Sequence, residues 1–120
     1  MMENLSKNYT TTDESCKYEA LDGEKVSKAL SMIDGKWKLK ILYVIGYNEV
    51  IRYGELKRQL NSITHKMLSS ELKALEYNGL IIRTEYPQIP PRVEYSLSSK
   101  GYGLLPMFDA LYDWIITFNI

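Results

Sequence analysis

The sequence predicts a mostly helical α+β fold with a small antiparallel β-ribbon. Through most of the first 78 residues, apolar side chains recur at spacings of three and four, as they do on the buried faces of helices. The period then falls to two in 80–84 and again in 93–97, which is typical of paired strands. A length of 120 residues, 45% hydrophobic and 25% charged, fits one globular domain.

Capping and breaking residues divide the helical part. Asp22-Gly23 and Asp34-Gly35 are expected to end helices, Thr64 to cap the last helix before the ribbon, and Gly79 to end it in the left-handed conformation. A short β-branched segment at 50–53 interrupts the series. The expected helices cover residues 13–21, 25–33, 36–47, 55–60 and 64–78.

The ribbon and the end of the chain complete the pattern. Three prolines between residues 87 and 91 stiffen the connection between the two strands and keep it out of a sheet. One final helix is expected to start at about residue 98 and to run to about residue 118. It is apolar on nearly every face, and Pro106 within it predicts a kink.

These elements occur in the order of a winged helix-turn-helix. A short helix, a turn and a longer helix form the helix-turn-helix unit, and the stiff-tipped ribbon that follows forms the wing. We expect residues 1–12 to be a flexible arm and 13–120 to be the domain. Residues 25–98 would form its DNA-binding core, and 13–24 and 99–120 its terminal dimerisation helices.

The formal net charge of zero conceals an uneven distribution. Residues 1–24 carry a net charge of −4, residues 25–100 carry +6 from thirteen basic and seven acidic side chains, and residues 101–120 carry −2. Affinity for nucleic acid follows local charge, because cations release the counterions condensed on phosphate. A DNA contact is therefore expected in the basic middle of the chain.

The helix after Thr64 has the composition of a helix that reads the major groove. Leu68, Leu72 and Leu75 fix its buried face, so its opposite face carries two cations and several short hydrogen-bonding groups. An ordinary solvated helix face is the alternative, and the wing that follows favours DNA. The expected contacts on this helix are Thr64, His65, Lys66, Ser69, Ser70 and Lys73.

The wing is expected to add contacts on its own side of the interface. Gln88 and Arg92 would reach DNA, with Arg83 near the base of the ribbon. The alternative is a surface hairpin whose arginines pair with Glu85 and Glu94.

Three further cations lie on the preceding helices. Lys36 and Lys38 flank a helix start, where free N–H groups and the helix dipole favour phosphate, although two solvated lysines would look the same. Arg58 lies on its helix opposite Leu56 and Leu60 and is the last expected DNA contact.

The final helix is too apolar to be satisfied within a domain of this size. We therefore expect it to pair with a second copy across a two-fold axis. The expected dimer contacts are Leu104, Leu105, Phe108, Leu111, Tyr112 and Ile115.

Several runs of residues match a known protein family. They are Ile33–Lys38, Arg52–Leu56, Ile63–Leu68 with Leu72, Leu75-Glu76 with Gly79-Leu80, Tyr86-Pro87 and Pro90–Leu97. In this order and at these separations, the runs resemble the HxlR-type family of MarR-like winged-helix regulators, and the similarity covers about residues 25–118. The resemblance implies a homodimeric transcription regulator that reads pseudo-palindromic sites with paired recognition helices and wings.

The chain departs from that family in its cysteine. Some members sense oxidants through a cysteine just before the helix that leads to the Gly-Lys-Trp run, and Glu24 occupies about that place here. The single cysteine, Cys16, lies some eight residues earlier among Asp13, Glu14 and Glu19, and carboxylates make a thiol less reactive by raising its pKa. A redox switch through Cys16 stays open as an alternative.

The sequence argues against an enzyme. His65 is the only histidine, and neither a glycine-rich phosphate loop nor a cluster with metal-ligand spacing is found, so no cofactor and no metal are expected. With one cysteine, no apolar run of membrane-spanning length and no secretory signal, the expected compartment is the cytoplasm, and no membrane contact is expected.

Two other roles stay open. A winged helix that binds another protein instead of DNA would use the acidic head and the aromatic tail of the chain. A small-molecule effector would find aromatic walls near Trp37, Tyr43 and Tyr112, where the sequence assigns no ligand residue.

Overall fold

The computed structural model describes residues 22–120, of which residues 22–31 belong to one unit and Met32–Ile120 form another. The arm expected at 1–12, the helix expected at 13–21 and Cys16 lie outside the described residues. In the first unit, α3 (Gly23–Ser31) begins and ends two residues earlier than predicted. Asp22 caps the start of this helix, because its carboxylate accepts a hydrogen bond from the Glu24 N–H at 2.9 Å.

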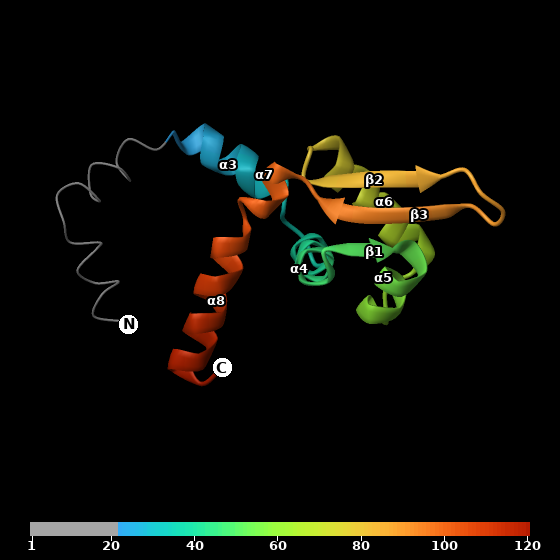
Figure 1. Cartoon of the computed structure of the whole chain (residues 1–120). Coiled ribbons are helices and arrows are strands. Elements are labelled where there is room, and N and C mark those ends of the chain that lie inside the picture. Colours follow the sequence, from blue (N-terminus) through green and yellow to red (C-terminus); the bar gives the residue numbers. More distant parts are fainter. Residues whose placement is uncertain (1–21) are drawn as a thin grey trace. The chain divides into compact units, whose positions relative to one another are not determined.

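The second unit contains the predicted helix-turn-helix followed by a ribbon (Figure 1). The fold is a winged helix, mostly helical with one antiparallel sheet, as the sequence predicts. Its elements are α4 (Lys38–Asn48), β1 (Val50–Arg52), α5 (Tyr53–Leu60), α6 (His65–Tyr77), β2 (Ile81–Tyr86), β3 (Arg92–Leu97), α7 (Ser99–Tyr102) and α8 (Leu105–Phe118).

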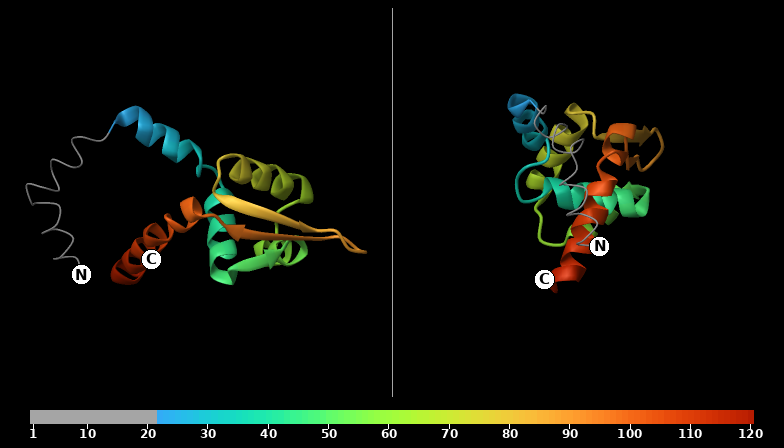
Figure 2. Two further views of the ribbon diagram at one scale, coloured as in Figure 1. Left: turned by 45° about the horizontal axis from the view of Figure 1, so that its top comes forward. Right: turned by 90° about the vertical axis from the view of Figure 1, so that its left-hand side faces the viewer.

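The sheet has three strands, one more than the predicted ribbon. β3 lies in the middle of the order β1-β3-β2 and pairs antiparallel with both neighbours. Tyr95 of β3 faces Ile51 on one side and Arg83 on the other. The β2–β3 hairpin extends past α5 and α6, and its loop lies at the far end from α8 (Figure 2). The wing is thus anchored to the helical core through β1.

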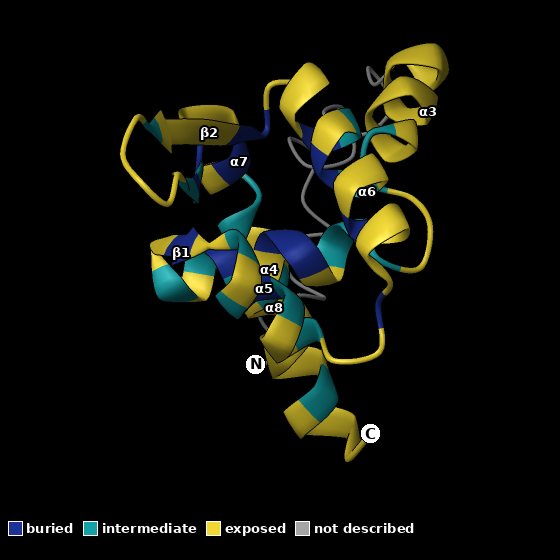
Figure 3. Cartoon of the chain, turned by 90° about the vertical axis from the view of Figure 1, so that its right-hand side faces the viewer, coloured by how far each residue is buried: buried dark blue, intermediate teal, exposed yellow. Residues whose placement is uncertain are grey.

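The core lies between α4, the helix-turn-helix and the sheet. Ile41, Leu42 and Ile45 make the buried face of α4, and Leu56 of α5 is fully buried beside them. Figure 3 shows this buried band running through α4. Burying each such side chain contributes about 1.5–3 kcal/mol. The predicted buried row of α6 is confirmed: Leu68, Leu72 and Leu75 are all at most 2% exposed.

The single final helix predicted by the sequence is two helices. α7 is capped by Ser98, whose hydroxyl accepts a hydrogen bond from the Gly101 N–H at 3.0 Å, and it ends at Tyr102. α8 then begins at Leu105 with Pro106 in its first turn. Proline lacks the N–H that would continue a helix but suits the start of a new one, so Pro106 marks a restart and not a kink.

Candidate nucleic-acid interface

The start of α6 is fixed by a cap and by its buried leucines. Thr64 is the N-cap, and its hydroxyl accepts a hydrogen bond from the Met67 N–H at 3.1 Å. This bond gives Thr64 a structural role in the helix. With the leucine row turned inward, the opposite face of α6 is exposed. That face carries the predicted residues His65, Lys66, Ser69, Ser70 and Lys73.

Glu71 does not weaken the positive charge of this face, because it is paired. Its Oε1 lies 2.7 Å from Nζ of Lys38, and both side chains are largely buried. Lys38 was a predicted phosphate contact, but in the structure its ammonium group pairs with the Glu71 carboxylate and is not available to a phosphate. Lys66 and Lys73 take part in no ion pair within residues 22–120.

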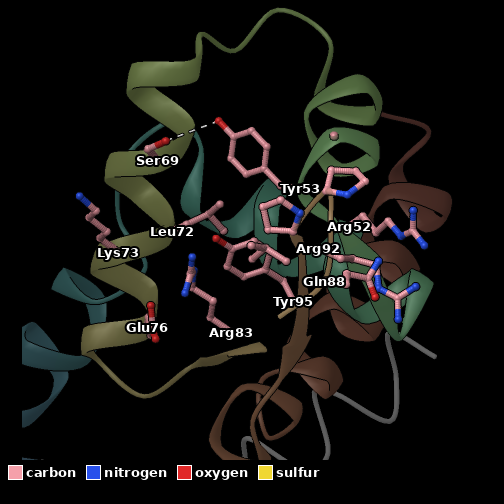
Figure 4. A pocket seen from close by; sticks show the side chains of 14 residues that line it. Arg52, Tyr53, Ser69, Leu72, Lys73, Glu76, Arg83, Gln88, Arg92 and Tyr95 are labelled. Atoms are coloured by element: carbon pink, nitrogen blue, oxygen red, sulfur yellow. Dashed lines mark hydrogen bonds between the residues drawn. The ribbon is translucent and has the colours of Figure 1, made fainter. Parts of the chain in front are cut away.

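An open cleft of about 710 Å³ separates α6 from the wing. Ser69 and Lys73 line it from α6, and Gln88 and Arg92 line it from the hairpin, so four predicted contacts meet in one place (Figure 4). Thr64, His65, Lys66 and Ser70 do not line this cleft. The charged side chains on its walls are Arg52, Lys73, Glu76, Arg83 and Arg92. Four cations and one carboxylate line the cleft, and two of the cations, Arg52 and Lys73, take part in no ion pair within residues 22–120, so the cleft is electropositive.

The wing arginines adopt the paired arrangement that the sequence left as an alternative. Arg83 Nη1 donates to Glu85 at 3.1 Å, and this bond is the largest cause that raises the pKa of Arg83. Nε of Arg92 lies 3.4 Å from Glu94, and its guanidinium lies 4.5 Å above the Tyr86 ring. Nε of Arg92 is buried and makes no hydrogen bond to any described residue, and neither do its two Nη groups.

Arg58 of α5 is also paired. It contacts Glu55 one turn earlier in the helix, while three quarters of its side chain stays exposed. A hydrogen bond from Gln59, with the charge of Arg58, holds the pKa of Glu55 below its usual value. An exposed pair of this kind is weak, so a phosphate can compete for the guanidinium.

The sequence did not single out Tyr53, which contacts the exposed face of α6. Its hydroxyl lies 3.1 Å from Nδ1 of His65 and 3.5 Å from Oγ of Ser69. The two rings stack with centroids 5.9 Å apart. No local pattern marks this tyrosine, because the contact forms only once the helix-turn-helix has folded. Arg52, which precedes it on the cleft wall, was missed for the same reason.

The predicted dimer residues divide between two environments. Leu104, Leu105 and Phe108 pack against the core of their own chain, and the Phe108 ring lies 5.5 Å from that of Tyr43. Ile115 is half-buried, whereas Leu111 and Tyr112 are exposed. The first three residues therefore hold α8 on α4 and are not free to face a partner.

A second face of α8 remains uncovered in the single chain. Met107, Leu111, Trp114 and Phe118 recur at spacings of four, three and four, which places them in one stripe. Their exposed fractions are 38%, 47%, 50% and 49%. No residue of α8 is buried, although the helix is strongly apolar.

A second cleft, of about 1130 Å³, lies between α4 and α8. Trp37, Tyr43 and Tyr112, the residues expected to give a small-molecule effector its aromatic walls, all line it. Lys36 and Lys40 hold their ammonium groups 5.1 and 5.2 Å from the Trp37 ring. Lys36, a predicted phosphate contact, is thus placed at the wall of this cleft.

Two other findings concern the described part of the chain. None of its helices is long and apolar enough to cross a membrane. Within the same residues, no group of histidine, cysteine and carboxylate side chains is arranged to hold a metal ion.

The sequence matches known regulators over most of its length. It is 54% identical over 85 residues to an uncharacterised HTH-type transcriptional regulator of Halalkalibacterium halodurans, covering 71% of this chain and 75% of that protein. It is 53% identical over 85 residues to the HTH-type regulator YdzF of Bacillus subtilis, also uncharacterised, covering 71% of this chain and 78% of that one.

Solved structures agree with the sequence matches. The redox regulator HypR in its oxidised form superimposes with a TM-score of 0.70 at 36% identity, over 78% of this chain and 95% of HypR. The reduced transcriptional regulator YodB of B. subtilis superimposes with a TM-score of 0.71 at 30% identity, over 82% and 95% of the two chains. The model of the HxlR-like helix-turn-helix family matches residues 32–119. The chain therefore belongs to the HxlR-like helix-turn-helix family, and it is a transcriptional regulator and not an enzyme.

Proposed function

We propose that this regulator binds double-stranded DNA as a homodimer at a pseudo-palindromic operator. The observation that carries the proposal is the exposed face of α6. Its cations Lys66 and Lys73 are free of ion pairs within the described part, and the nearby carboxylate of Glu71 is neutralised by Lys38. An α-helix fits the major groove, and residues near its start reach base edges.

In this arrangement, α6 enters the major groove with His65, Lys66 and Ser69 foremost. Ser70 and Lys73 follow further along the same helix. The cap at Thr64 supports the first turn of α6 and leaves its early N–H groups near the phosphates that flank the groove.

The wing contacts the flanking backbone or the minor groove beside α6. The cleft between α6 and the hairpin is lined by four cations, which gives a phosphate strand a positive channel to follow. Arg92 contributes its Nη groups, Gln88 a neutral amide nearer the tip, and Arg58 is a peripheral contact from α5.

Dimerisation is proposed through the exposed stripe of α8. Met107, Leu111, Trp114 and Phe118 present apolar side chains in the 4-3-4 pattern of helices that pair along a seam. A second copy is the proposed partner, because a stripe on one helix is self-complementary across a two-fold axis. Paired α8 helices would give two recognition helices for the two halves of the operator.

Selection from a random DNA pool tests this proposal. The purified protein should enrich an inverted repeat, and sedimentation of the complex should give two chains per duplex. If no sequence is enriched from the pool and the protein does not bind DNA even at low salt, DNA binding is contradicted. That result would favour the alternative of a winged helix that binds another protein.

A redox switch through Cys16 is the second candidate. It is favoured by the 36% identity to HypR, which is a redox regulator. Cys16→Ser should then keep DNA bound under an oxidant that releases the wild-type protein. Equal binding by the two proteins before and after oxidant would remove this candidate.

A further inference from the structure

The hydroxyl of Tyr53 lies beneath the first turn of the recognition helix. It is 3.1 Å from Nδ1 of His65 and 3.5 Å from both the His65 carbonyl oxygen and Oγ of Ser69. Figure 4 shows the tyrosine reaching from the start of α5 to the α6 serine. The nearest of these partners is the imidazole nitrogen, and the ring planes differ by only 12°.

The direction of this hydrogen bond decides which ring nitrogen carries the proton. A phenol is a good donor, and a bare imidazole nitrogen is the strongest acceptor within its reach. If the Tyr53 hydroxyl donates to Nδ1, the neutral ring must carry its hydrogen on Nε2. Nε2 makes no hydrogen bond to any described residue, and His65 is exposed.

We propose that Tyr53 is a positioning residue that sets the specificity of the reading face, by holding His65 in the Nε2–H form. His65 then presents a hydrogen-bond donor to the groove. The acceptors on base edges there are N7 and O6 of guanine, N7 of adenine and O4 of thymine. A donor at this position favours guanine, which offers two adjacent acceptors.

The Tyr53 hydroxyl also orients the hydroxyl group of Ser69. Because the Tyr53 hydrogen is directed to His65, the phenol oxygen is free to accept the hydroxyl hydrogen of Ser69 at 3.5 Å. Ser69 would then keep its oxygen lone pairs for the amino group of adenine or cytosine. His65 and Ser69 are one helical turn apart, so Tyr53 gives α6 a donor followed by an acceptor on one face.

The first test is made on the free protein. His65 is the only histidine in the chain, so its two ring nitrogens give the only histidine signals in a ¹⁵N–¹H correlation spectrum. At pH 8.5 the wild-type ring should show a bare Nδ1 and a protonated Nε2. Tyr53→Phe should change the Nδ1 chemical shift and yield a mixture of the Nδ1–H and Nε2–H forms. Tyr77→Phe, at the exposed end of α6, should leave the shifts of both nitrogens unchanged. A proton on Nδ1 of the wild-type protein, or no change in Tyr53→Phe, would overturn the inference.

The second test measures base preference and rests on the proposed DNA binding. With a selected operator and its single-base variants, Tyr53→Phe should lower the preference at one base pair by about two- to tenfold, the worth of one hydrogen bond. The dependence on salt should stay the same, because no phosphate contact is lost. In a His65→Ala background, Tyr53→Phe should have no further effect on that base pair.

The two tests separate the possible failures. If neither protein binds DNA, the proposed function fails, and the reading role fails with it, whatever the ring nitrogens show. If both bind DNA with the same preferences at every base pair, DNA binding stands and the role of Tyr53 is refuted. If Tyr53→Phe still changes the preference at the base pair contacted by His65 when His65 is absent, the hydroxyl does not act through His65 and the inference is refuted as well.

Discussion

Nζ of Lys38 lies 2.7 Å from Oε1 of Glu71, and this ion pair joins the first residue of α4 to the middle of α6. Only 16% and 13% of the two side chains are exposed. Glu71 follows Ser70 on α6, so its charge would otherwise repel a phosphate bound near the exposed face of that helix. The pair therefore fixes α6 on α4 and also neutralises that carboxylate.

Breaking this pair should destabilise the fold. Lys38→Met leaves the Glu71 carboxylate without its partner in a largely buried position, at a cost of about 1–3 kcal/mol. Urea unfolding followed by circular dichroism measures it. Adding Glu71→Gln removes the unpaired charge and should recover part of the loss, which a double-mutant cycle makes visible. If Lys38→Met unfolds with the same urea midpoint as the wild-type protein, the pair contributes nothing to the free energy of unfolding.

The cap of α6 should have a separable effect on stability. Thr64→Ala removes the oxygen that accepts from the Met67 N–H, and loss of an N-cap costs about 1 kcal/mol. Thr64→Ser keeps that oxygen and is the matched control, so its melting temperature should stay close to that of the wild-type protein. If the alanine and serine variants melt together, the hydroxyl does not cap the helix.

Gly101 should tolerate no side chain. A Cβ built there would lie 2.2 Å from the Leu80 carbonyl oxygen, so α7 and the start of β2 would have to separate. Gly101→Ala should cost about 1–3 kcal/mol, as overpacking does. Gly54→Ala is the control: its Cβ meets nothing within 4 Å, and alanine in α5 should leave stability unchanged or raise it by about 0.5–1 kcal/mol. Equal melting temperatures for the two variants would contradict this packing.

The exposed stripe of α8 predicts how the dimer can be broken. Trp114→Glu places a charge in the middle of the stripe and should shift the sedimentation of the protein from two chains to one. Ile116→Glu changes an exposed residue, 63% accessible, near the polar side of α8 and should leave the dimer intact. A dimer that survives Trp114→Glu, or one that Ile116→Glu dissociates equally, would place the interface elsewhere.

Local features of the fold were predictable from the sequence. The leucine row of α6, its Thr64 cap and the left-handed Gly79 that follows it all depend on residues within one or two helical turns. Such features depend on the local sequence alone and not on contacts between distant segments. The position of α6 and of its exposed face could therefore be predicted from the sequence.

Features that join distant segments were not predictable in this way. Lys38 and Glu71 are 33 residues apart, and the sequence suggested Lys38 as a phosphate contact without indicating that Glu71 is its partner. The same holds for β1 pairing with β3 and for Tyr53 beneath His65. At Pro106 the signal was present but ambiguous, because proline both kinks a helix and starts one.

The salt dependence of DNA binding tests the central claim most directly. Affinity for a selected operator is measured by fluorescence anisotropy over a range of salt concentrations for three proteins. They are the wild type, Lys66→Ala at the start of α6, and Lys100→Ala, which removes an equal charge beside the other end of that helix. We expect Lys66→Ala to bind more weakly and to lower the slope of log affinity against log salt by about one unit, while Lys100→Ala keeps the wild-type slope. Identical affinities and slopes for all three proteins would contradict the placement of α6 on DNA.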